Sequence, residues 1–291
     1  MHTPSAADSL PVSSALLDLE RGASLREFNT FGLPATAQTL VHLHSEADVK
    51  RVVNDPELGR APKFILGGGS NLVLTQDVDR CVLKVEIKGI RLLETRDDAW
   101  IVEVGAGERW HDTVAWCLAQ GLPGLENMAL IPGTVGAAPV QNIGAYGVEL
   151  QDRFDSLDAI DLETGRLFTL DAAQCAFGYR DSVFKHASRG PNGMGLAGRA
   201  LILRVRFALP RPWKPVLGYL DLERKRAETG IAAPSARQVF DWVCAIRRAK
   251  LPDPAVIGNA GSFFKNPTVT PEQCADIIAR DPKGVHYPMP D

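Results

Sequence analysis

The alternation of apolar and polar residues in the first part of the chain predicts two short strands joined through a helix. Residues 39–44 alternate as the residues of a half-buried strand do, and residues 63–66 form a short apolar strand. Between them, Ser45 is typical of a helix N-cap, with Asp48 in the position of the reciprocal cap, and the helix is expected to end near Val53. This segment therefore has a β-α-β pattern, and a cluster of glycines follows its second strand.

The middle of the chain predicts further strands and one more helix. Strand patterns cover residues 81–85, 99–104, 156–162 and 200–209, whereas residues 110–120 have helical spacing. Because the strands do not alternate regularly with helices, the pattern indicates an α+β class.

Two capped helices are predicted in the last part of the chain. Residues 235–238 form a capping box ahead of apolar residues that share one helical face, namely Val239, Trp242, Val243 and Ile246. Prolines that follow Lys250 end this helix. Residues 258–264 are expected to form a tight turn into a strand, and residues 270–273 open the last helix with a proline at its first position.

Composition and charge narrow the class of protein. Hydrophobic residues make up 45% and charged residues 23% of the 291 residues, as in an ordinary soluble globular protein. The net charge of −3 lacks the basic excess of a nucleic-acid binder. Five scattered cysteines without a C-x-x-C pair favour reduced thiols in a cytosolic protein. Residues 1–14 lack the basic and apolar regions of a signal peptide and are expected to form a frayed tail.

A glycine cluster directly after the strand at 63–66 is the first candidate for chemistry. Its backbone amides could approach a phosphate closely, and its serine and asparagine add donors. It is neither a Walker A loop nor a Rossmann fingerprint, because Leu72 stands where the last glycine would be. A plain tight turn is the alternative. The candidate residues are Gly67, Gly68, Gly69, Ser70 and Asn71.

The most unusual segment is residues 131–147, seventeen mostly small residues without a charge. Small side chains let a large planar or phosphorylated ligand lie against the backbone. The surrounding stretch 127–148 is long enough to cross a bilayer, but its prolines, glycines and amides argue against a membrane helix. The sequence therefore favours a loop-rich ligand site.

Isolated polar residues are open to structural explanations when each is taken alone. Arg180 suits bidentate capture of a carboxylate or phosphate, but a surface salt bridge also explains it. Ser262 could donate a proton inside a dry pocket, yet a hydroxyl that satisfies a turn is the simpler explanation. His42 and His44 share a strand face, but no third ligand is evident, so no metal site is predicted.

Taken together, several segments resemble the UDP-N-acetylenolpyruvoylglucosamine reductase family, flavoenzymes of bacterial peptidoglycan precursor synthesis. The matching segments are Asn29–Gly32, Leu66–Asn71, Ile131–Ala138 with Gln141–Tyr146, Gly178–Ser182, and Lys250–Pro254 with Gly258–Pro267. They occur in the family's order from about residue 25 onward. Residues 218–220 match the subtype in which a tyrosine-bearing crossover segment folds over the substrate.

The resemblance implies an α+β, FAD-binding fold of the vanillyl-alcohol-oxidase type. Residues 13–78 and 79–245 would form two flavin-binding domains, and residues 246–291 a substrate-binding domain that is incomplete at its C-terminus. The cofactor would be FAD and no metal is implied. Besides the glycine cluster, the matching cofactor-binding residues are Pro132, Gly133, Gly136, Ala137, Ala138, Gly144, Ala145 and Tyr146.

The resemblance also implies the reaction and its residues. Hydride passes from NADPH to flavin N5 and then to C3 of the enolpyruvyl ether of the UDP-sugar, and the carbanion or enolate at C2 is protonated. Ser262 matches the family's proton donor, and Arg180 matches the residue that stabilises the enolate carboxylate. The substrate-contacting positions are matched by Tyr179, Tyr219, Lys250 and Asn266.

Such an enzyme would serve cell wall biogenesis, and thereby cell shape, cell cycle and cell division. It is expected to be a cytoplasmic monomer that neither binds nucleic acid nor inserts into a membrane.

At its end the chain departs from the family's pattern. Family members continue past the equivalent of Asp291, and the part that is lacking here carries a catalytic glutamate that works beside Arg180 and Ser262. The chain is therefore expected to bind FAD weakly and to reduce the substrate poorly. The alternatives are a sugar or alcohol oxidase of the same flavin fold, which would carry a covalent-flavin histidine near the glycine loops, and a non-catalytic flavin-binding remnant.

Overall fold

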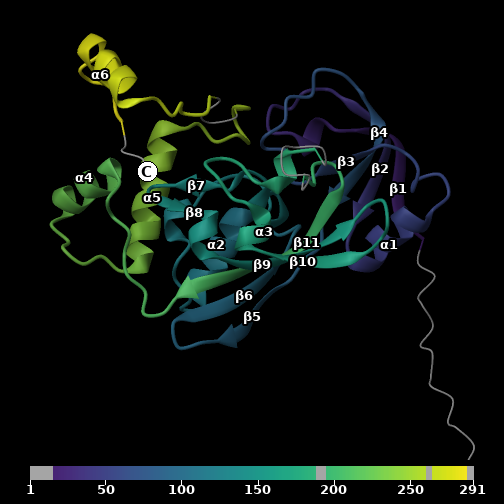
Figure 1. Ribbon diagram of the computed structural model, residues 1–291, viewed down its shortest axis with the longest axis horizontal. Helices are drawn as coiled ribbons and strands as arrows, with labels where there is room; N and C mark the ends of the chain where they lie inside the picture. The colour runs from purple at the N-terminus through teal and green to yellow at the C-terminus, as the bar shows by residue number, and fades with distance from the viewer. Residues whose placement is uncertain (1–15, 188–194, 260–263, 287–291) are drawn as a thin grey trace, which may run out of the picture. The chain divides into compact units, whose positions relative to one another are not determined.

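The computed structural model of the protein describes residues 16–187, 195–259 and 264–286 (Figure 1). The chain divides into two compact units, Met1–Ala260 and Gly261–Asp291. Within the described residues, the first unit holds a four-stranded, a five-stranded and a two-stranded β-sheet, and the second unit holds one helix.

The first sheet has four strands in the order β1-β2-β4-β3 (Figure 1). Its elements are β1 (Asp18–Ser24), the short helix η1 (Arg26–Phe28), β2 (Thr36–Leu43), α1 (Glu46–Asn54), β3 (Lys63–Leu66) and β4 (Val78–Val85). β4 pairs in parallel with both β2 and β3, whereas β1 is antiparallel to β2. The predicted cap is confirmed, because the Ser45 hydroxyl accepts a hydrogen bond from the Asp48 amide at the start of α1.

One boundary prediction conflicts with the pairing of β4. The strand expected at residues 81–85 lies beyond the predicted division between residues 78 and 79, yet β4 is hydrogen-bonded between β2 and β3. This strand therefore belongs to the first sheet. A hydrophobic pattern shows that residues form a strand but not which strands it pairs with, so the sequence could not reveal that β4 lies between β2 and β3.

The second sheet has five antiparallel strands in the order β10-β9-β11-β6-β5 (Figure 1). The strands are β5 (Ile90–Thr95), β6 (Ala99–Gly105), β9 (Phe154–Asp161), β10 (Leu167–Asp171) and β11 (Ala200–Pro210). The three strands predicted here, β6, β9 and β11, are found within two residues of their expected bounds. The α+β class is therefore confirmed.

The predicted uncharged stretch 127–148 is a series of short elements. These are η2 (Glu126–Met128), η3 (Val135–Ala137), η4 (Pro139–Gln141), β7 (Gly144–Ala145) and β8 (Val148–Glu149), followed by η5 (Leu150–Arg153). In the part of the chain that the structure describes, no helix is long and apolar enough to cross a membrane.

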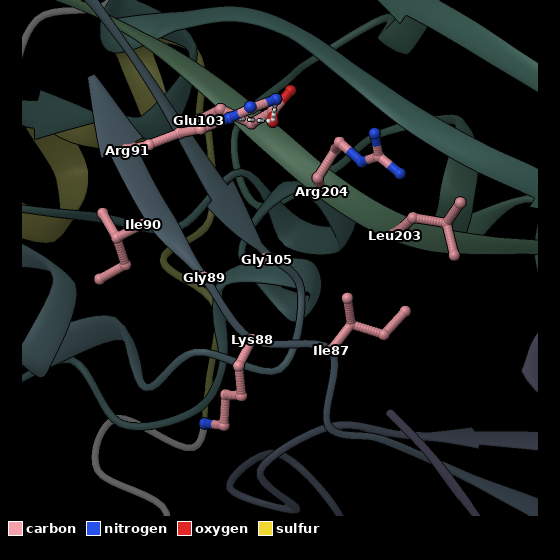
Figure 2. A pocket seen from close by; sticks show the side chains of 9 residues that line it. All are labelled: Ile87, Lys88, Gly89, Ile90, Arg91, Glu103, Gly105, Leu203 and Arg204. Atoms are coloured by element: carbon pink, nitrogen blue, oxygen red, sulfur yellow. Dashed lines mark hydrogen bonds and ion pairs between the residues drawn. The ribbon is translucent and has the colours of Figure 1, made fainter. Parts of the chain in front are cut away.

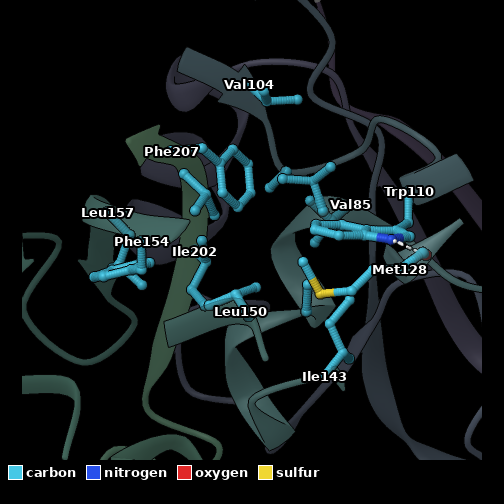
Figure 3. Packing of buried hydrophobic residues seen from close by; sticks show 14 of the residues in the cluster. Val85, Val104, Trp110, Met128, Ile143, Leu150, Phe154, Leu157, Ile202 and Phe207 are labelled. Atoms are coloured by element: carbon cyan, nitrogen blue, oxygen red, sulfur yellow. Dashed lines mark hydrogen bonds between the residues drawn. The ribbon is translucent and has the colours of Figure 1, made fainter. Parts of the chain in front are cut away.

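The main hydrophobic core fastens this stretch to the second sheet (Figure 3). Met128 and Ile143 are buried in the same cluster as Phe207 of β11. The Trp110 ring meets the Phe207 ring edge-on at 5.7 Å, and the Trp110 indole donates to the Met128 carbonyl at 2.8 Å. Burial of each such large side chain contributes roughly 1.5–3 kcal/mol to the free energy of folding. The loops of this stretch are therefore packed stably on the second sheet.

The remaining helices of the first unit are α2 (Trp110–Ala119), α3 (Ala172–Cys175), η6 (Val183–Lys185), α4 (Leu220–Thr229) and α5 (Ala236–Lys250). The predicted capping box of α5 is confirmed, with Ser235 and Gln238 each bonding the other's backbone amide. Val239, Trp242 and Val243 are buried on the predicted face.

The second unit contains α6 (Pro271–Arg280), which starts with the predicted proline after a Thr270–Gln273 capping box. The strand expected after the turn at 258–264 is wrong for residues 264–269, which the structure describes without a strand. The sequence there contains Phe264 and Val269, but a strand also needs a neighbouring strand to pair with, and no described strand pairs with these residues. Part of the expected turn, residues 260–263, lies outside the described residues.

Candidate active site

The structure brings the two predicted glycine-rich loops into direct contact. A methyl group added at Gly68 would lie 2.8 Å from the Gly133 Cα atom, and one added at Gly67 would lie 2.7 Å from the Thr134 hydroxyl. The Asn71 side chain donates to the Gln141 side chain at 2.8 Å. Only residues without a Cβ allow the two backbones to approach this closely.

Unused hydrogen-bonding groups gather where these loops meet. The backbone amides of residues 68–71 donate no hydrogen bond to another described residue. The Thr134 hydroxyl is buried, and it too has no partner among the described residues. Because a fold normally satisfies its polar backbone groups, such a cradle of donors is suited to a phosphate.

Strained backbone clusters in the same region. Leu130, Asn142, Tyr146 and Arg180 are four of the five non-glycine residues with positive φ in the described ranges. The first three lie in the uncharged stretch, and the Arg180 side chain contacts it. Such strain costs about 1–3 kcal/mol per residue and gathers at functional sites.

The Arg180 guanidinium contacts the uncharged stretch 127–148. The second glycine-rich loop, which includes Gly133 and Thr134, belongs to the same stretch. Its Nη2 donates to the Gly144 carbonyl at 2.8 Å, and its Nη1 donates to the Asn142 carbonyl at 3.3 Å. Nη1 also forms an ion pair with Glu149 at 3.1 Å. The Tyr179 ring lies 4.9 Å from the guanidinium carbon. About 30% of the Arg180 side chain stays exposed, so the group can still meet a ligand.

Two of the predicted tyrosines also come together in the structure. The rings of Tyr146 and Tyr219 meet edge-on at 5.2 Å. Asn127 donates to the carbonyls of both Tyr146 and Val216, so it ties the two tyrosine-bearing segments to each other. The Arg247 guanidinium of α5 lies near the Tyr146 phenol, where its positive charge favours the ionised phenol and opposes the effect of burial on the pKa. Burial raises the pKa of this phenol and lowers the pKa of the Arg247 guanidinium.

The other predicted residues are placed less tightly. Lys250 forms an ion pair with Asp221 of α4 at 2.6 Å, which leaves its side chain more than half exposed. Asn266 is exposed and belongs to the second unit. Ser262 lies outside the described residues.

Glu149, Asn142 and Arg247 contact predicted site residues but were not themselves predicted. Nothing in the local sequence around Arg247 places it beside a tyrosine that lies far from it in the chain. A signal existed for Glu149, because it is the first charged residue after the uncharged stretch 127–148. Its partner Arg180 is 31 residues further along the chain, so spacing alone could not join the two.

His42 of β2 and His44, which follows the strand, have carboxylate neighbours. The Nδ1 atom of His42 lies 2.7 Å from Oε2 of Glu86. The Nε2 atom of His44 lies 3.4 Å from Oδ2 of Asp18. Among the described residues, no group of three or more His, Cys, Asp or Glu side chains is arranged to hold a metal ion.

A hollow of about 320 Å³ lies beside β5 and β6 (Figure 2). Its three cationic side chains are paired: Lys88 with Glu108 at 3.6 Å, Arg91 with Glu103 at 2.6 Å and Arg204 with Glu46 at 3.1 Å. None of the predicted site residues lines this hollow. The candidate site is therefore the surface formed by the glycine loops, Arg180 and the tyrosine pair.

Known proteins resemble this chain over nearly its whole length. Residues 37–171 match the model of a family described as FAD binding domain. A UDP-N-acetylenolpyruvoylglucosamine reductase from Azoarcus sp. is 57% identical over 279 residues, which cover 94% of this chain and 78% of the relative. A protein of the same name from Burkholderia vietnamiensis is 52% identical over 284 residues, covering 97% of this chain and 79% of the relative.

A solved structure agrees with these relatives at the level of the fold. The crystal structure of UDP-N-acetylenolpyruvylglucosamine reductase from Thermus caldophilus matches with a TM-score of 0.59 at 23% identity. The match covers 91% of this chain and 81% of that chain. The expected FAD-binding α+β fold is confirmed.

Proposed function

Because the chain belongs to the UDP-N-acetylenolpyruvoylglucosamine reductase family, we propose that it reduces the enolpyruvyl ether of UDP-N-acetylglucosamine to UDP-N-acetylmuramate. FAD is its cofactor, NADPH is its co-substrate, and the reaction belongs to peptidoglycan precursor synthesis. The observation that carries this proposal is 57% identity across 94% of the chain. The same identity favours the reductase over an oxidase that uses the same flavin fold.

The cradle of unused donors fits the diphosphate of FAD. The amides of residues 68–71 and the buried Thr134 hydroxyl offer donors that no described residue uses. The loops that would hold the cofactor therefore include residues 67–71, residues 132–138 and the turn at 144–146. When bound, FAD takes a hydride from NADPH and delivers it to the enolpyruvyl group.

Arg180 would hold the carboxylate of the substrate's enolpyruvyl group. Three acceptors, Glu149 and two loop carbonyls, fix its guanidinium before the substrate arrives. A preoriented cation stabilises the negative charge that grows on an enolate carboxylate, without reorganisation during the reaction. The partial exposure of Arg180 leaves room for this contact.

The remaining roles are proposed from the motifs that carry the family resemblance. Ser262 would donate the proton that C2 of the substrate receives. Tyr179, Tyr219, Lys250 and Asn266 would contact the UDP-sugar. The tyrosine pair supports this in part, because Tyr219 already packs on the Tyr146 ring of the cofactor loop. We further propose a monomeric, cytoplasmic enzyme that supports cell division, since NADPH and UDP-sugars are cytoplasmic compounds.

The test uses the purified chain, reconstituted with FAD. NADPH oxidation is followed with and without the enolpyruvyl ether of UDP-N-acetylglucosamine, and the product is identified by mass spectrometry. We expect substrate-dependent oxidation in the wild type and an approximately 100-fold slower rate in Arg180→Lys, because an ammonium group cannot replace the planar fork at a carboxylate. Flavin reduction by simple sugars or alcohols, with reoxidation by oxygen, would instead establish the oxidase.

A further inference from the structure

We propose that Glu149 is a positioning residue, which fixes the Arg180 guanidinium for the substrate carboxylate and acts on the reaction only through Arg180. This inference rests on the proposed function. It assigns a role to the one carboxylate that touches Arg180 among the described residues.

The two oxygens of the Glu149 carboxylate serve different partners. Oε1 accepts from Arg180 Nη1 at 3.1 Å. Oε2 accepts from the Asn142 side-chain amide at 2.9 Å and from the Gln151 side-chain amide at 3.1 Å. All three partners are donors, so both oxygens must be acceptors. A carboxylate meets this requirement, whereas a glutamine would turn its NH2 group toward at least one donor.

Asn142 links the carboxylate to the backbone that carries Arg180. Its side-chain amide nitrogen also donates to the Gly178 carbonyl at 3.0 Å, two residues before Arg180. The side-chain oxygen of Asn142 accepts a hydrogen bond from the backbone N–H of Gln151 at 3.0 Å. Asn142 is completely buried and has a φ of 42°, so its position is fixed by packing at the cost of strain. One buried amide thus orients both partners of the ion pair.

The absence of a side chain at Gly144 allows Glu149 and Arg180 to approach each other closely enough to form their ion pair. A Cβ atom there would lie 2.9 Å from Glu149 Cγ and 3.0 Å from Arg180 Nη1. The same residue offers its carbonyl to Arg180 Nη2. The ion pair is therefore packed directly on the segment proposed to bind the cofactor.

The arrangement leaves donors of Arg180 for a ligand. Its three hydrogen bonds within the described residues use both hydrogens of Nη1 and one of Nη2. The N–H of Nε and the second N–H of Nη2 remain, which is enough for bidentate pairing with a carboxylate. Since Glu149 holds one end of the guanidinium, the free donors keep one orientation.

The experiment compares Glu149→Gln, Arg180→Lys and the double variant with the wild type, each reconstituted with FAD. Glu103→Gln is the matched control, because Glu103 is a buried carboxylate that accepts hydrogen bonds from Arg91 (Figure 2) and Arg206, neither of which is a proposed site residue. Three quantities are measured: kcat and KM for the enolpyruvyl ether, the rate of NADPH oxidation with an artificial electron acceptor, and calorimetric binding of the ether and of UDP-N-acetylglucosamine.

We expect Glu149→Gln to slow turnover with the enolpyruvyl ether about 10- to 100-fold, because a misplaced guanidinium loses the aligned contact. The rate with the artificial acceptor, which does not involve Arg180, should be unchanged. Glu149→Gln should also weaken binding of the enolpyruvyl ether more than binding of UDP-N-acetylglucosamine, which has no enolpyruvyl carboxylate. The double variant should be no slower than Arg180→Lys alone, since Glu149 acts through Arg180. Glu103→Gln should keep wild-type kinetics.

Different failures separate the two proposals. An active wild type with an equally active Glu149→Gln variant, or a double variant in which the two losses add, overturns the inference and leaves the proposed function intact. A wild type without ether-dependent NADPH oxidation overturns the proposed function and the inference with it. If Glu149→Gln does not fold, Glu149→Asp provides the same test, because the shorter side chain keeps the charge but cannot span both Arg180 and Asn142.

Discussion

The contact between Gly68 and Gly133 sets how closely the two glycine-rich loops approach. The backbone of Gly68 has no unusual φ, so its substitution by alanine would create a clash without backbone strain. The added methyl group would meet the Gly133 Cα atom at 2.8 Å, and that atom belongs to backbone that cannot rotate away. The donors around this contact are the ones proposed to bind the FAD diphosphate.

We predict that Gly68→Ala weakens FAD binding by about 10- to 100-fold, because forcing packed backbones apart costs about 1–3 kcal/mol. Flavin absorbance per protein after gel filtration, and a fluorescence titration with FAD, measure the effect. Gly22→Ala is the control, since Gly22 has a φ of 65° and open space around it. It should lower stability by about 1–2 kcal/mol through strain alone and leave FAD affinity unchanged. Equal FAD affinity in Gly68→Ala and the wild type would contradict the prediction.

At the scale of single elements, α5 connects local sequence to the site. Its capping box satisfies backbone amides at the first turn, and its buried face joins the main core. Arg247 and Lys250 extend from its last turn. The position of these two cations therefore depends on a helix whose start was already recognisable from the sequence.

Ser235→Ala should lower the free energy of unfolding by about 1 kcal/mol, because the first turn loses the hydroxyl that accepts from the Gln238 amide. Urea denaturation followed by circular dichroism measures this loss. Thr270→Ala is the matched variant, since it removes the same kind of capping box from α6, which has no buried residue. It should leave the main unfolding transition in place. A shift of that transition by Thr270→Ala but not by Ser235→Ala would be the opposite result.

The second sheet carries a charged ladder across its central strands. Asp158 of β9 accepts from Arg206 of β11 at 2.6 Å and from Thr169 of β10 at 2.8 Å. Burial alone would raise the pKa of Asp158, but these hydrogen bonds and the nearby arginines outweigh it and hold the pKa below its ordinary value of 3.8. The unfolded chain therefore binds more protons than the folded protein when the pH falls through 3.8.

This difference gives the sign of the pH dependence. The contribution of Asp158 to stability is complete above its ordinary pKa and is lost as the pH falls from 3.8 toward the lower pKa of the folded protein. We predict that the urea midpoint of the wild type drops below about pH 4, and that Asp158→Asn is less stable at neutral pH and loses less over the same acid range. Urea titrations at several pH values measure both slopes. Parallel slopes in the two proteins would show that Asp158 does not contribute.

For the whole molecule, the strands of the two large sheets that sequence patterns missed are all edge strands, although β3, which is also an edge strand, was predicted from its short apolar run. β6, β9 and β11 alternate or are continuously apolar because they lie inside the second sheet. β1, β5 and β10 were not predicted, and each is an edge strand with mostly exposed residues. An edge strand owes its conformation to pairing with a neighbour, so its own sequence carries little periodicity.

The same distinction applies to the candidate site. The glycine loops and the Gly178–Ser182 motif were recognisable because backbone geometry demands particular residues there. Glu149 and Asn142 were not, because their importance depends on partners that the fold brings together. Asn142, for example, bonds both Glu149 and the carbonyl of Gly178, which lies 36 residues away in the chain.

Burial predicts how stability is distributed through the chain. β11 is paired on both sides, with β6 and β9, and most of its residues are buried. By contrast, residues 264–286 of the second unit include no buried residue. Local opening is governed by how much core a segment contributes, so the two segments should differ strongly in hydrogen exchange. Glu149 and Arg180 should lie near the stable end of this range, since both form hydrogen bonds with Asn142, which is buried next to the core residue Ile143.

We therefore predict that amides of β11 exchange only on global unfolding, whereas amides of α6 exchange orders of magnitude faster. Hydrogen-exchange mass spectrometry of the chain without substrate measures both. Peptides that cover residues 142–149 should resemble β11 more than α6, because Asn142 and Ile143 are buried in the first unit. Protection of α6 equal to that of β11 would contradict the prediction. If it holds, the anchor for the substrate carboxylate is preorganised in the first unit before the substrate binds.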